Sequence, residues 1–474
     1  MFGGLPVVRV INFTGDTWVS RLEDGSPDED LLRIADALGR LAHEGRPGST
    51  VYVGYDTRSL SVALAAEVGE VIAAHGVRAL VSDAHCPMPA LSEAVRRNPA
   101  AFGGIMLTAG NRPADYVGAR VRMADGSAAT PADTDVLEAL IVPESPSRRG
   151  EAERVDIVTP LLERISAFAD GQAVADSSPL VVCDPMHGAT SSHARRLLSA
   201  LGAHTIEIHD GDDEDFGGLH PEVVEPWIDD CEQAVVDNGA AYGFALDGAG
   251  ERLALVDDRG RLVSPHKMLA LIMEYLVRGR GVTGRMVAPI FVSSIVRRQA
   301  DRLGLPLTVT PAGYVWMREE MAAGDVVCAG DALGGITIPA VGLERDPLAV
   351  AALVAELVAA DGRPLSAISD DLERVVGHME YARRDVRMGS GDIQMLRNIL
   401  PGLNPASVAG RTPVSVSHSA GSLRLSFDDD SWLLVRPSRT LPAARVYAEA
   451  PTPALRDGLL DAGARLACSP LAGE

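Results

Sequence analysis

The sequence predicts an α/β protein made of three doubly wound α/β units and one smaller C-terminal α+β unit. The chain has 474 residues, which is too many for one hydrophobic core, and 46% of them are hydrophobic. Strand and helix patterns alternate from Thr50 to Ala360, as in parallel sheets covered by helices. Beyond Glu373 the chain becomes rich in short β-type runs, several of them alternating, which favours antiparallel strands.

The first α/β unit is predicted over residues 1–150. Apolar residues recur at helical spacing from Asp28 to Leu41, and Thr50–Val53 is a β-branched run that ends in a glycine. The polar segment 143–150 breaks the pattern and is predicted to be a linker. The predicted strands are 5–13, 50–53, 78–82 and a buried run ending at 107, and the predicted helices are 28–41, 61–75 and 91–96.

The remaining units follow from the same patterns. The second, over 151–258, has predicted helices at 155–168 and 191–201 and strands at 180–183, 205–208, 242–246 and 253–256. The third, over 259–372, has predicted helices at 266–277, 293–303 and 347–360, a helix ending at 321, and strands at 286–291, 307–310 and 336–338. The α+β unit, over 373–474, has β-type runs at 413–418, 422–427 and 432–435.

Charge and composition exclude several classes of partner. A net charge of −22 argues against nucleic-acid binding and against an anionic membrane surface, since both require surplus cations. No run approaches the ~20 apolar residues of a membrane helix, and the N-terminus does not resemble a signal peptide. The five cysteines are far apart and form no CxxC, which favours reduced, buried thiols. We expect a cytoplasmic protein.

An anionic small molecule remains a candidate ligand, and arginine would have to bind it. Lys267 is the only lysine, so phosphate contacts must come from guanidinium groups, which bind phosphate through two parallel hydrogen bonds. The scarcity of lysine is itself more simply explained by a GC-rich genome.

Four loops occur in order, one in each predicted unit. They are TAGNRP at 108–113, DGAGER at 247–252, GDALGG at 330–335 and VRPSRTLPAARVYAEA at 435–450. Together they resemble the α-D-phosphohexomutases, the phosphoglucomutase and phosphomannomutase group, over nearly the whole chain. The resemblance implies four domains around a central cleft, where a phosphoserine loop, a metal loop, a sugar loop and a phosphate loop meet.

The phosphate loop is the best preserved of the four. It is similar to the family's RPSGTEPKIRVYAEA, and the resemblance implies phosphate binding by Arg436, Ser438, Thr440 and Arg445. Arg439 replaces the family's glycine and is a further candidate ligand, or a residue that points into solvent. The alternative is a polar turn that only stabilises a small domain.

The phosphoserine loop has lost its reactive groups. Gly110 stands where the family has the serine that carries the transferred phosphate, so covalent transfer has no acceptor there. Asn111 replaces the neighbouring histidine and cannot act as an acid or base near neutral pH. Thr108 is left open as a weak substitute nucleophile, against the simpler interpretation of a hydroxyl that bonds the local backbone.

The metal and sugar loops have also lost charged and polar side chains. The family's DGDADR keeps its first carboxylate as Asp247, loses the second to Ala249, and has Glu251 for the third. We expect no resident cofactor, and weak Mg²⁺ binding by Asp247 and Glu251 is the alternative. In the sugar loop only Asp331 remains as a polar contact for a hexose, and Val315 replaces the family's acid/base lysine.

These losses predict a mutase-like protein that binds a phosphosugar or a similar anion but is catalytically inactive or repurposed. It would act as a ligand sensor or as a partner of an active paralogue, and a homo-oligomer is also left open. Two alternatives remain. One is an active hexose-phosphate mutase, an intramolecular phosphotransferase using Thr108 or Asp247 as acceptor. The other is a scaffold without a ligand.

Overall fold

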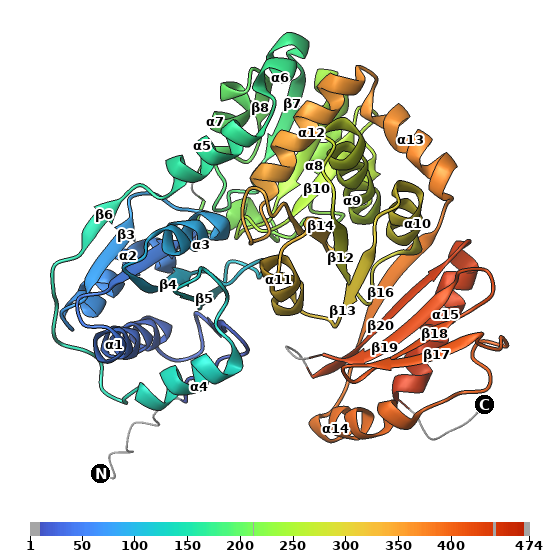
Figure 1. Cartoon of the computed structure of the whole chain (residues 1–474). Helices are drawn as coiled ribbons and strands as arrows, with labels where there is room; N and C mark the ends of the chain where they lie inside the picture. The colour runs from blue at the N-terminus through green and yellow to red at the C-terminus, as the bar shows by residue number, and fades with distance from the viewer. Residues whose placement is uncertain (1–9, 212, 439–441, 469–474) are drawn as a thin grey trace. The chain divides into compact units, whose positions relative to one another are not determined.

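The structure is a computed structural model of the chain, and it describes residues 10–211, 213–438 and 442–468. It divides into two compact units, which we call unit 1 (residues 1–265 and 333–368) and unit 2 (residues 266–332 and 369–474). Helices and strands alternate through most of the chain, and a final antiparallel sheet follows (Figure 1), so the predicted fold class is confirmed. The predicted boundaries of the four units stay a prediction.

The first sheet of unit 1 has the strand order β1-β5-β4-β2-β3-β6. Parallel pairing joins β2 to β3 and β4, and β3 to β6, whereas β5 runs antiparallel to β4 and β1. The strands are β1 (Thr17–Arg21), β2 (Thr50–Tyr55), β3 (Arg78–Ser82), β4 (Ala101–Leu107), β5 (Tyr116–Met123) and β6 (Glu153–Val155). The helices are α1 (Pro27–Gly45), α2 (Ser59–Ala73), α3 (Met88–Arg97) and α4 (Pro131–Leu140).

Two sequence predictions fail at the edges of this sheet. The strand predicted at 5–13 lies partly outside the described residues, and residues 10–13 are irregular, with Ile11 buried in the core. The edge strand is β1 instead, because β5 offers it an antiparallel partner. The helix predicted from Val155 begins at Val158, since Val155 pairs with β3 and the Asp156 carboxylate accepts the Val158 N–H at 3.0 Å.

The second sheet of unit 1 has the order β11-β10-β9-β7-β8. Here β7 pairs in parallel with β8 and β9, and β10 runs antiparallel to β9 and β11. The strands are β7 (Leu180–Asp184), β8 (His204–Glu207), β9 (Tyr242–Leu246), β10 (Leu253–Asp257) and β11 (Leu262–Val263). The helices are α5 (Val158–Phe168), α6 (Gly171–Ser177), α7 (His193–Ala200), the short η1 (Phe216–Gly218) and α8 (Asp229–Asn238).

A distant segment completes unit 1. It contains β15 (Ile336–Thr337) and α12 (Pro347–Asp361), and α12 packs against α5, α6 and α7 (Figure 1). The Glu356 carboxylate on α12 accepts a hydrogen bond from the Asp170 N–H at 2.9 Å. Every residue from Pro347 to Val358 is buried, as a helix that is apolar on all sides except at Glu356 requires.

Unit 2 begins with parallel strands. β12 (Arg285–Pro289) lies between β13 (Leu307–Thr310) and β14 (Val326–Gly330) and is parallel to both. The helices here are α9 (Pro265–Glu274), its π-helical extension η2 (Tyr275–Gly279), α10 (Ser294–Leu303), α11 (Tyr314–Ala322) and most of α13 (Leu365–Val376), whose first four residues belong to unit 1.

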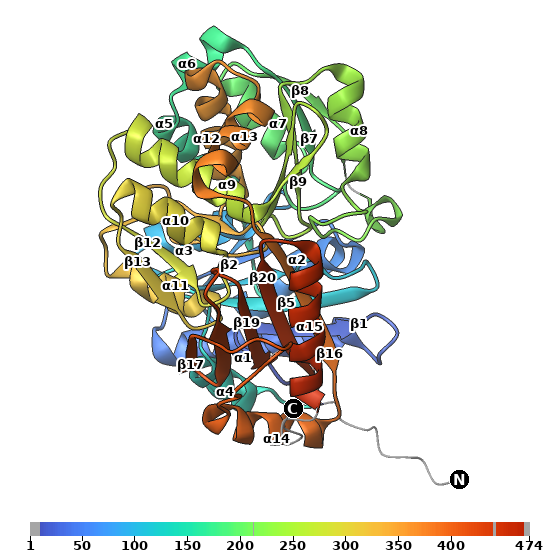
Figure 2. The ribbon, with the colours of Figure 1, turned by 90° about the vertical axis from the view of Figure 1, so that its right-hand side faces the viewer.

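Unit 2 ends with an antiparallel sheet in the order β16-β20-β19-β18-β17. Helix α15 lies along one face of this sheet and contacts β16, β19 and β20 (Figure 2). The strands are β16 (Glu380–Arg387), β17 (Ser415–Ser419), β18 (Ser422–Ser426), β19 (Trp432–Pro437) and β20 (Ala443–Ala450). The helices are α14 (Ser390–Ile399), η3 (Leu400–Gly402) and α15 (Pro453–Cys468).

The cysteine prediction holds with one exception. Cys86, Cys183, Cys231 and Cys328 are free and buried, whereas Cys468 is exposed at the end of α15. Within the described ranges, no helix is both long and apolar enough to cross a membrane.

Candidate functional site

One buried arginine, Arg58, stabilises the turn at residues 108–113 in unit 1 through hydrogen bonds to its backbone. Arg58 is 2% exposed, and its Nε donates to the Asp56 carboxylate at 3.0 Å. Its two terminal nitrogens donate to backbone carbonyl oxygens at 2.6–3.0 Å, those of Gly110, Arg112, Pro113 and Tyr116. This fixes the path of the loop without any contribution from a side chain at position 110.

Gly110 lies at the half-buried bend of this turn in a left-handed conformation. Its φ is +68°, and a Cβ built on it would have no heavy atom within 4 Å. The hydroxyl of Thr108 is fully buried and accepts the Gly110 N–H at 3.0 Å. The geometry therefore gives Thr108 a bond within the turn, as the simpler interpretation of its sequence position expected.

The segment 247–252 lies directly against this turn. A Cβ on Gly248 would come within 3.3 Å of the Gly110 carbonyl oxygen, so the two backbones approach closely. Asp247 is 1% exposed, and its Oδ1 accepts the N–H groups of Glu251 at 2.7 Å and Arg252 at 3.1 Å. Burial raises the pKa of the Asp247 carboxyl to about 6, although Arg252 opposes the shift.

Glu251 is bound by two arginines. Its Oε1 is 2.8 Å from Nη1 of Arg120 and 3.0 Å from Nη2 of Arg345. Burial alone would raise the pKa of Glu251, but the two guanidinium groups hold that pKa well below its ordinary value. Glu251 is therefore ionised and already neutralised by protein cations.

These residues do not fit a magnesium ion. Mg²⁺ requires near-octahedral oxygen ligands at 2.0–2.1 Å, and an oxygen of each carboxylate is already held by backbone N–H groups or guanidinium groups. Across residues 10–211, 213–438 and 442–468 there is no cluster of three or more His, Cys, Asp or Glu that could hold a metal. We therefore derive no chemistry from Mg²⁺ at Asp247 and Glu251.

The ion pairs of Glu251 extend into a buried network that the sequence did not reveal. Asp16 Oδ2 is 3.2 Å from Nε of Arg120 and 2.5 Å from Nη1 of Arg122, and Arg122 reaches Glu344 at 3.6 Å. The only sequence signal was two arginines, two residues apart, within the otherwise apolar strand β5. That spacing places both side chains on one face of the sheet.

In unit 2, the predicted phosphate-binding residues flank a hairpin turn. Arg436 on β19 and Arg445 on β20 are direct cross-strand partners. Burial lowers the pKa of Arg445, and the neighbouring positive charges of Arg436 and Arg383 lower it further. Like charges that face each other across strands repel, and a bound anion would relieve this repulsion. Arg439 and Thr440 lie outside the described residues.

Arg436 is 8% exposed and lies among aromatic rings. Its Nη2 donates to the Tyr447 hydroxyl at 2.9 Å, and its guanidinium carbon is 5.7 Å from the Phe291 ring centre. Ring contacts of this kind orient a guanidinium without neutralising its charge. Arg436 thus stays available for a charge-assisted contact to an anion.

One further arginine reaches the phosphate loop. Nη2 of Arg397 on α14 donates to the Ser438 carbonyl oxygen at 3.3 Å, and the Ser438 N–H donates to the Ala443 carbonyl at 2.8 Å. Sequence reasoning missed Arg397, because its helix precedes the loop by about forty residues and carries no motif.

The part of the sugar loop that belongs to unit 2, residues 330–332, lies beside the phosphate loop. Asp331 is 8% exposed, and Ala332 packs in one apolar cluster with Phe291 and Tyr447, the rings beside Arg436. Asp331 lies close enough to Tyr381 to influence the pKa of its phenol, which burial chiefly raises. Unit 2 therefore gathers Asp331, Arg436 and Arg445 in one region.

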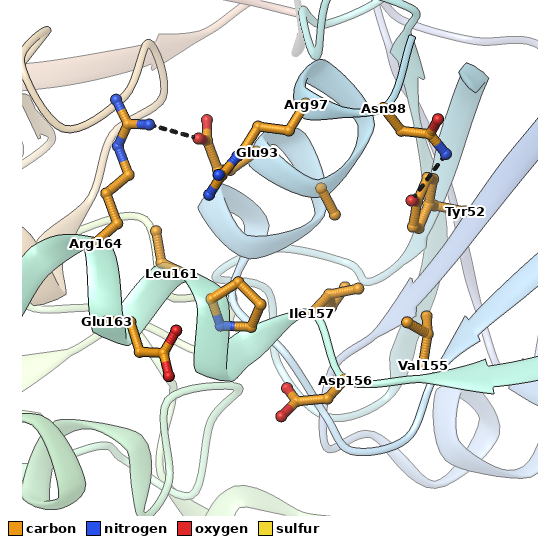
Figure 3. A pocket seen from close by; sticks show the side chains of 12 residues that line it. Tyr52, Glu93, Arg97, Asn98, Val155, Asp156, Ile157, Leu161, Glu163 and Arg164 are labelled. Atoms are coloured by element: carbon orange, nitrogen blue, oxygen red, sulfur yellow. Dashed lines mark hydrogen bonds and ion pairs between the residues drawn. The ribbon is translucent and has the colours of Figure 1, made fainter. Parts of the chain in front are cut away.

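A separate cavity of about 700 Å³ lies in unit 1 (Figure 3). It is lined by Tyr52 of β2, by residues of α3 and by the segment 155–164. Glu93 pairs with Arg164 at 2.9 Å, and Asn98 donates to the Tyr52 hydroxyl at 3.1 Å. Its acidic residues outnumber its two arginines, so its charge does not suit a phosphate, and none of the predicted site residues lines it.

Three family models match the chain in succession. They are described as the alpha/beta/alpha domains I, II and III of phosphoglucomutase/phosphomannomutase, and they match residues 21–147, 160–260 and 264–375.

Two relatives match along nearly their whole length. A phosphoglucosamine mutase of Frankia alni is 30% identical over 437 residues, which cover 90% of this chain and 89% of that protein. A phosphoglucomutase/phosphomannomutase of Thermococcus kodakarensis is 27% identical over 444 residues, which cover 92% of this chain and 94% of the relative.

Solved structures agree in fold. A Thermus thermophilus protein assigned as a phosphomannomutase superposes with a TM-score of 0.84 at 28% identity, covering 97% of this chain and 99% of that one. A family protein from Burkholderia thailandensis gives a TM-score of 0.81 at 20% identity, covering 97% and 98% of the two chains, which shows the shared fold alone.

Proposed function

Because the chain belongs to the phosphoglucomutase/phosphomannomutase family of α-D-phosphohexomutases, we propose that it binds a phosphosugar without transferring phosphate through a phosphoserine. The observation that carries this proposal is the pair Arg436 and Arg445, two guanidinium groups on facing residues beside a hairpin turn. They concentrate positive charge locally in a chain whose net charge is −22. Ser438 follows directly after β19, and the sequence adds Arg439 and Thr440, which lie outside the described residues, as further candidate ligands.

The absence of a nucleophile supports the second half of the proposal. Gly110 has no side chain to carry a phosphate, and the Thr108 hydroxyl is buried and bonded within the turn. Asp331 is the polar group of the sugar loop that remains to contact a hexose hydroxyl. The protein would then act through binding, as a ligand sensor or as a partner of an active paralogue.

Calorimetric titration tests the binding proposal. Glucose 1-phosphate, glucose 6-phosphate, glucosamine 6-phosphate and mannose 6-phosphate would each be compared with inorganic phosphate. Loss of one charge-assisted hydrogen bond in Arg436→Gln or Arg445→Gln should weaken binding about 10- to 100-fold. The matched control is Arg384→Gln on the same sheet, because Arg384 pairs with Asp461 at the surface and should leave binding unchanged. If the titrations show no binding of any of the sugar phosphates, the proposal is wrong.

A second candidate function is an active hexose-phosphate mutase with a non-standard acceptor. The names of the relatives favour it, since the Frankia alni protein is a phosphoglucosamine mutase and the Thermococcus kodakarensis protein a phosphoglucomutase/phosphomannomutase. The test is conversion of glucose 1-phosphate to glucose 6-phosphate in the presence of glucose 1,6-bisphosphate. Turnover that is abolished by Asp247→Ala or Thr108→Ala would replace our proposal with this one.

A further inference from the structure

The segment 247–252 stands where active family members hold a divalent cation, and here three arginines surround its second acidic residue. Arg120 and Arg345 contact Glu251 directly, and Arg122 joins the same network through Asp16. All of these side chains belong to unit 1, and none is more than 13% exposed. The network is therefore a buried feature and not a solvated surface cluster.

Arg120 is the centre of the network. Its Nε lies 3.2 Å from Asp16 Oδ2 and its Nη1 lies 2.8 Å from Glu251 Oε1, so one planar guanidinium bridges two carboxylates. A divalent cation in a protein does the same work, since it neutralises carboxylates that converge from separate segments. The bridge joins residues 16, 120 and 251, which come from three separate segments of the chain.

Charge balance leaves no place for a further cation. Arg120, Arg122 and Arg345 match the three carboxylates of Asp16, Glu251 and Glu344 in number. The Oδ1 of Asp247 already accepts the N–H groups of Glu251 at 2.7 Å and of Arg252 at 3.1 Å. Adding a divalent ion would leave buried positive charge uncompensated.

We propose that the guanidinium group of Arg120, bridging Asp16 and Glu251, takes the place of a divalent cation in unit 1. The folded chain then neither needs nor holds Mg²⁺ at residues 247–252. This goes beyond the proposed phosphosugar binding, which depends on unit 2, so the two proposals can fail independently.

The first test uses the unaltered full-length chain. Titration with Mn²⁺, followed by electron paramagnetic resonance, should show no ion bound at concentrations up to about 1 mM, the range of weak protein sites. EDTA should leave the melting temperature unchanged. Stoichiometric binding of one Mn²⁺ at residues 247–252, or a melting temperature that EDTA lowers, overturns the proposal whatever the variants do.

The second test removes the bridging guanidinium. Arg120→Ala leaves Asp16 and Glu251 facing each other across the vacated space, and breaking this buried ion pair should lower the melting temperature by about 6 °C or more. Mg²⁺ or Mn²⁺ should then restore a large part of that loss, because a divalent ion can enter between the two carboxylates. Arg120→Lys, which keeps a positive charge there, should lose less stability and show no such rescue.

The matched control is Arg78→Ala, which breaks an exposed pair with Glu153 and should show neither a large loss nor rescue by a divalent ion. Destabilisation of Arg120→Ala without rescue, or no destabilisation at all, overturns the proposal. If Arg120→Ala does not fold, Arg120→Gln, which removes the charge but keeps part of the side-chain volume, is used for the same rescue measurement.

Discussion

Replacing Gly110 by serine reintroduces the hydroxyl that a phosphoserine mechanism needs, so this variant tests the site most directly. The change is sterically open, because a Cβ at this position has no heavy atom within 4 Å. The backbone is the obstacle, since a φ of +68° is a left-handed conformation that residues with a side chain adopt at a cost.

The size of the effect follows from two opposing contributions. Placing a non-glycine residue in the left-handed region costs about 1–2 kcal/mol. Removing a glycine also restricts the unfolded chain, which returns about 0.4–1 kcal/mol. We therefore expect Gly110→Ser to lower the free energy of unfolding by about 1 kcal/mol, the difference between these values.

Denaturant unfolding checks this value against two controls. Gly110→Ala carries the same backbone strain without the hydroxyl and should lose the same stability. Gly103→Ala should lose far more, because its Cβ would lie 2.3 Å from the Arg122 carbonyl oxygen and the strands would have to move apart. Equal losses at positions 110 and 103 would refute the reasoning.

The serine variant should also remain inactive. A new hydroxyl at position 110 would face a segment whose Asp247 binds backbone N–H groups and whose Glu251 binds arginines. Mass spectrometry after incubation with glucose 1,6-bisphosphate and Mg²⁺ should therefore find no phosphorylated Ser at this position. Stable phosphorylation together with mutase turnover would show that the loss of the serine is the only catalytic defect.

Three other changes are expected to have measurable effects. Burial lowers the pKa of His193 to about 4, from a value near 6.5 in the unfolded chain. The free energy of unfolding should therefore be highest above pH 6.5 and fall by on the order of 3 kcal/mol as the pH drops to 4. In melting curves recorded at different pH values, His193→Gln should show a smaller decrease over this range. Glu449→Gln should lower the free energy of unfolding by about 2–4 kcal/mol in denaturant unfolding. The reason is that the buried carboxylate accepts hydrogen bonds from Trp432 Nε1 and the Ser294 N–H, and the amide N–H₂ of glutamine would face one of these donors. An equal loss in Glu380→Gln, whose carboxylate is half-buried, would contradict this. Arg58→Lys should increase hydrogen exchange at residues 110–116, since an ammonium cannot reach the four carbonyl oxygens that the guanidinium holds; unchanged exchange would rule out that role.

Local patterns were enough to predict the secondary structure that a short segment imposes on itself. The strand at 78–82 was predicted to the residue from its apolar run, and the helix predicted at 293–303 spans 294–303, with Gly304 after its last residue. The predictions of secondary structure fail where pairing with a distant segment determines which residues form a strand. Residues 10–13 have a strand-like composition, but the strand that pairs with β5 begins at Thr17.

The candidate site divides in the same way. Arg436, Ser438 and Arg445 could be predicted because they lie within ten residues on one strand, turn and strand, so the chain itself brings them together. Arg397 could not, since it reaches the loop from α14. Equally, Glu251 was predicted as a weak metal ligand from its loop alone. Its ion pairs with Arg120 and Arg345 could not be predicted, because these arginines are far from it in the sequence.

By itself, the sequence determined the α/β fold class, the family resemblance and the absence of a side chain at Gly110, and it predicted the phosphate-loop residues, since each depends on residue type and short-range spacing. The tertiary structure decided what the remaining charged groups do. Asp16, Arg120, Glu251 and Arg345 are far apart along the chain, and only folding brings them within 3.2 Å of one another in pairs. The sequence shows where a carboxylate occurs, but the fold determines which cation lies next to it, because the fold decides which segments are buried together. In a buried site, that nearest cation determines whether a metal ion is needed to neutralise the carboxylate.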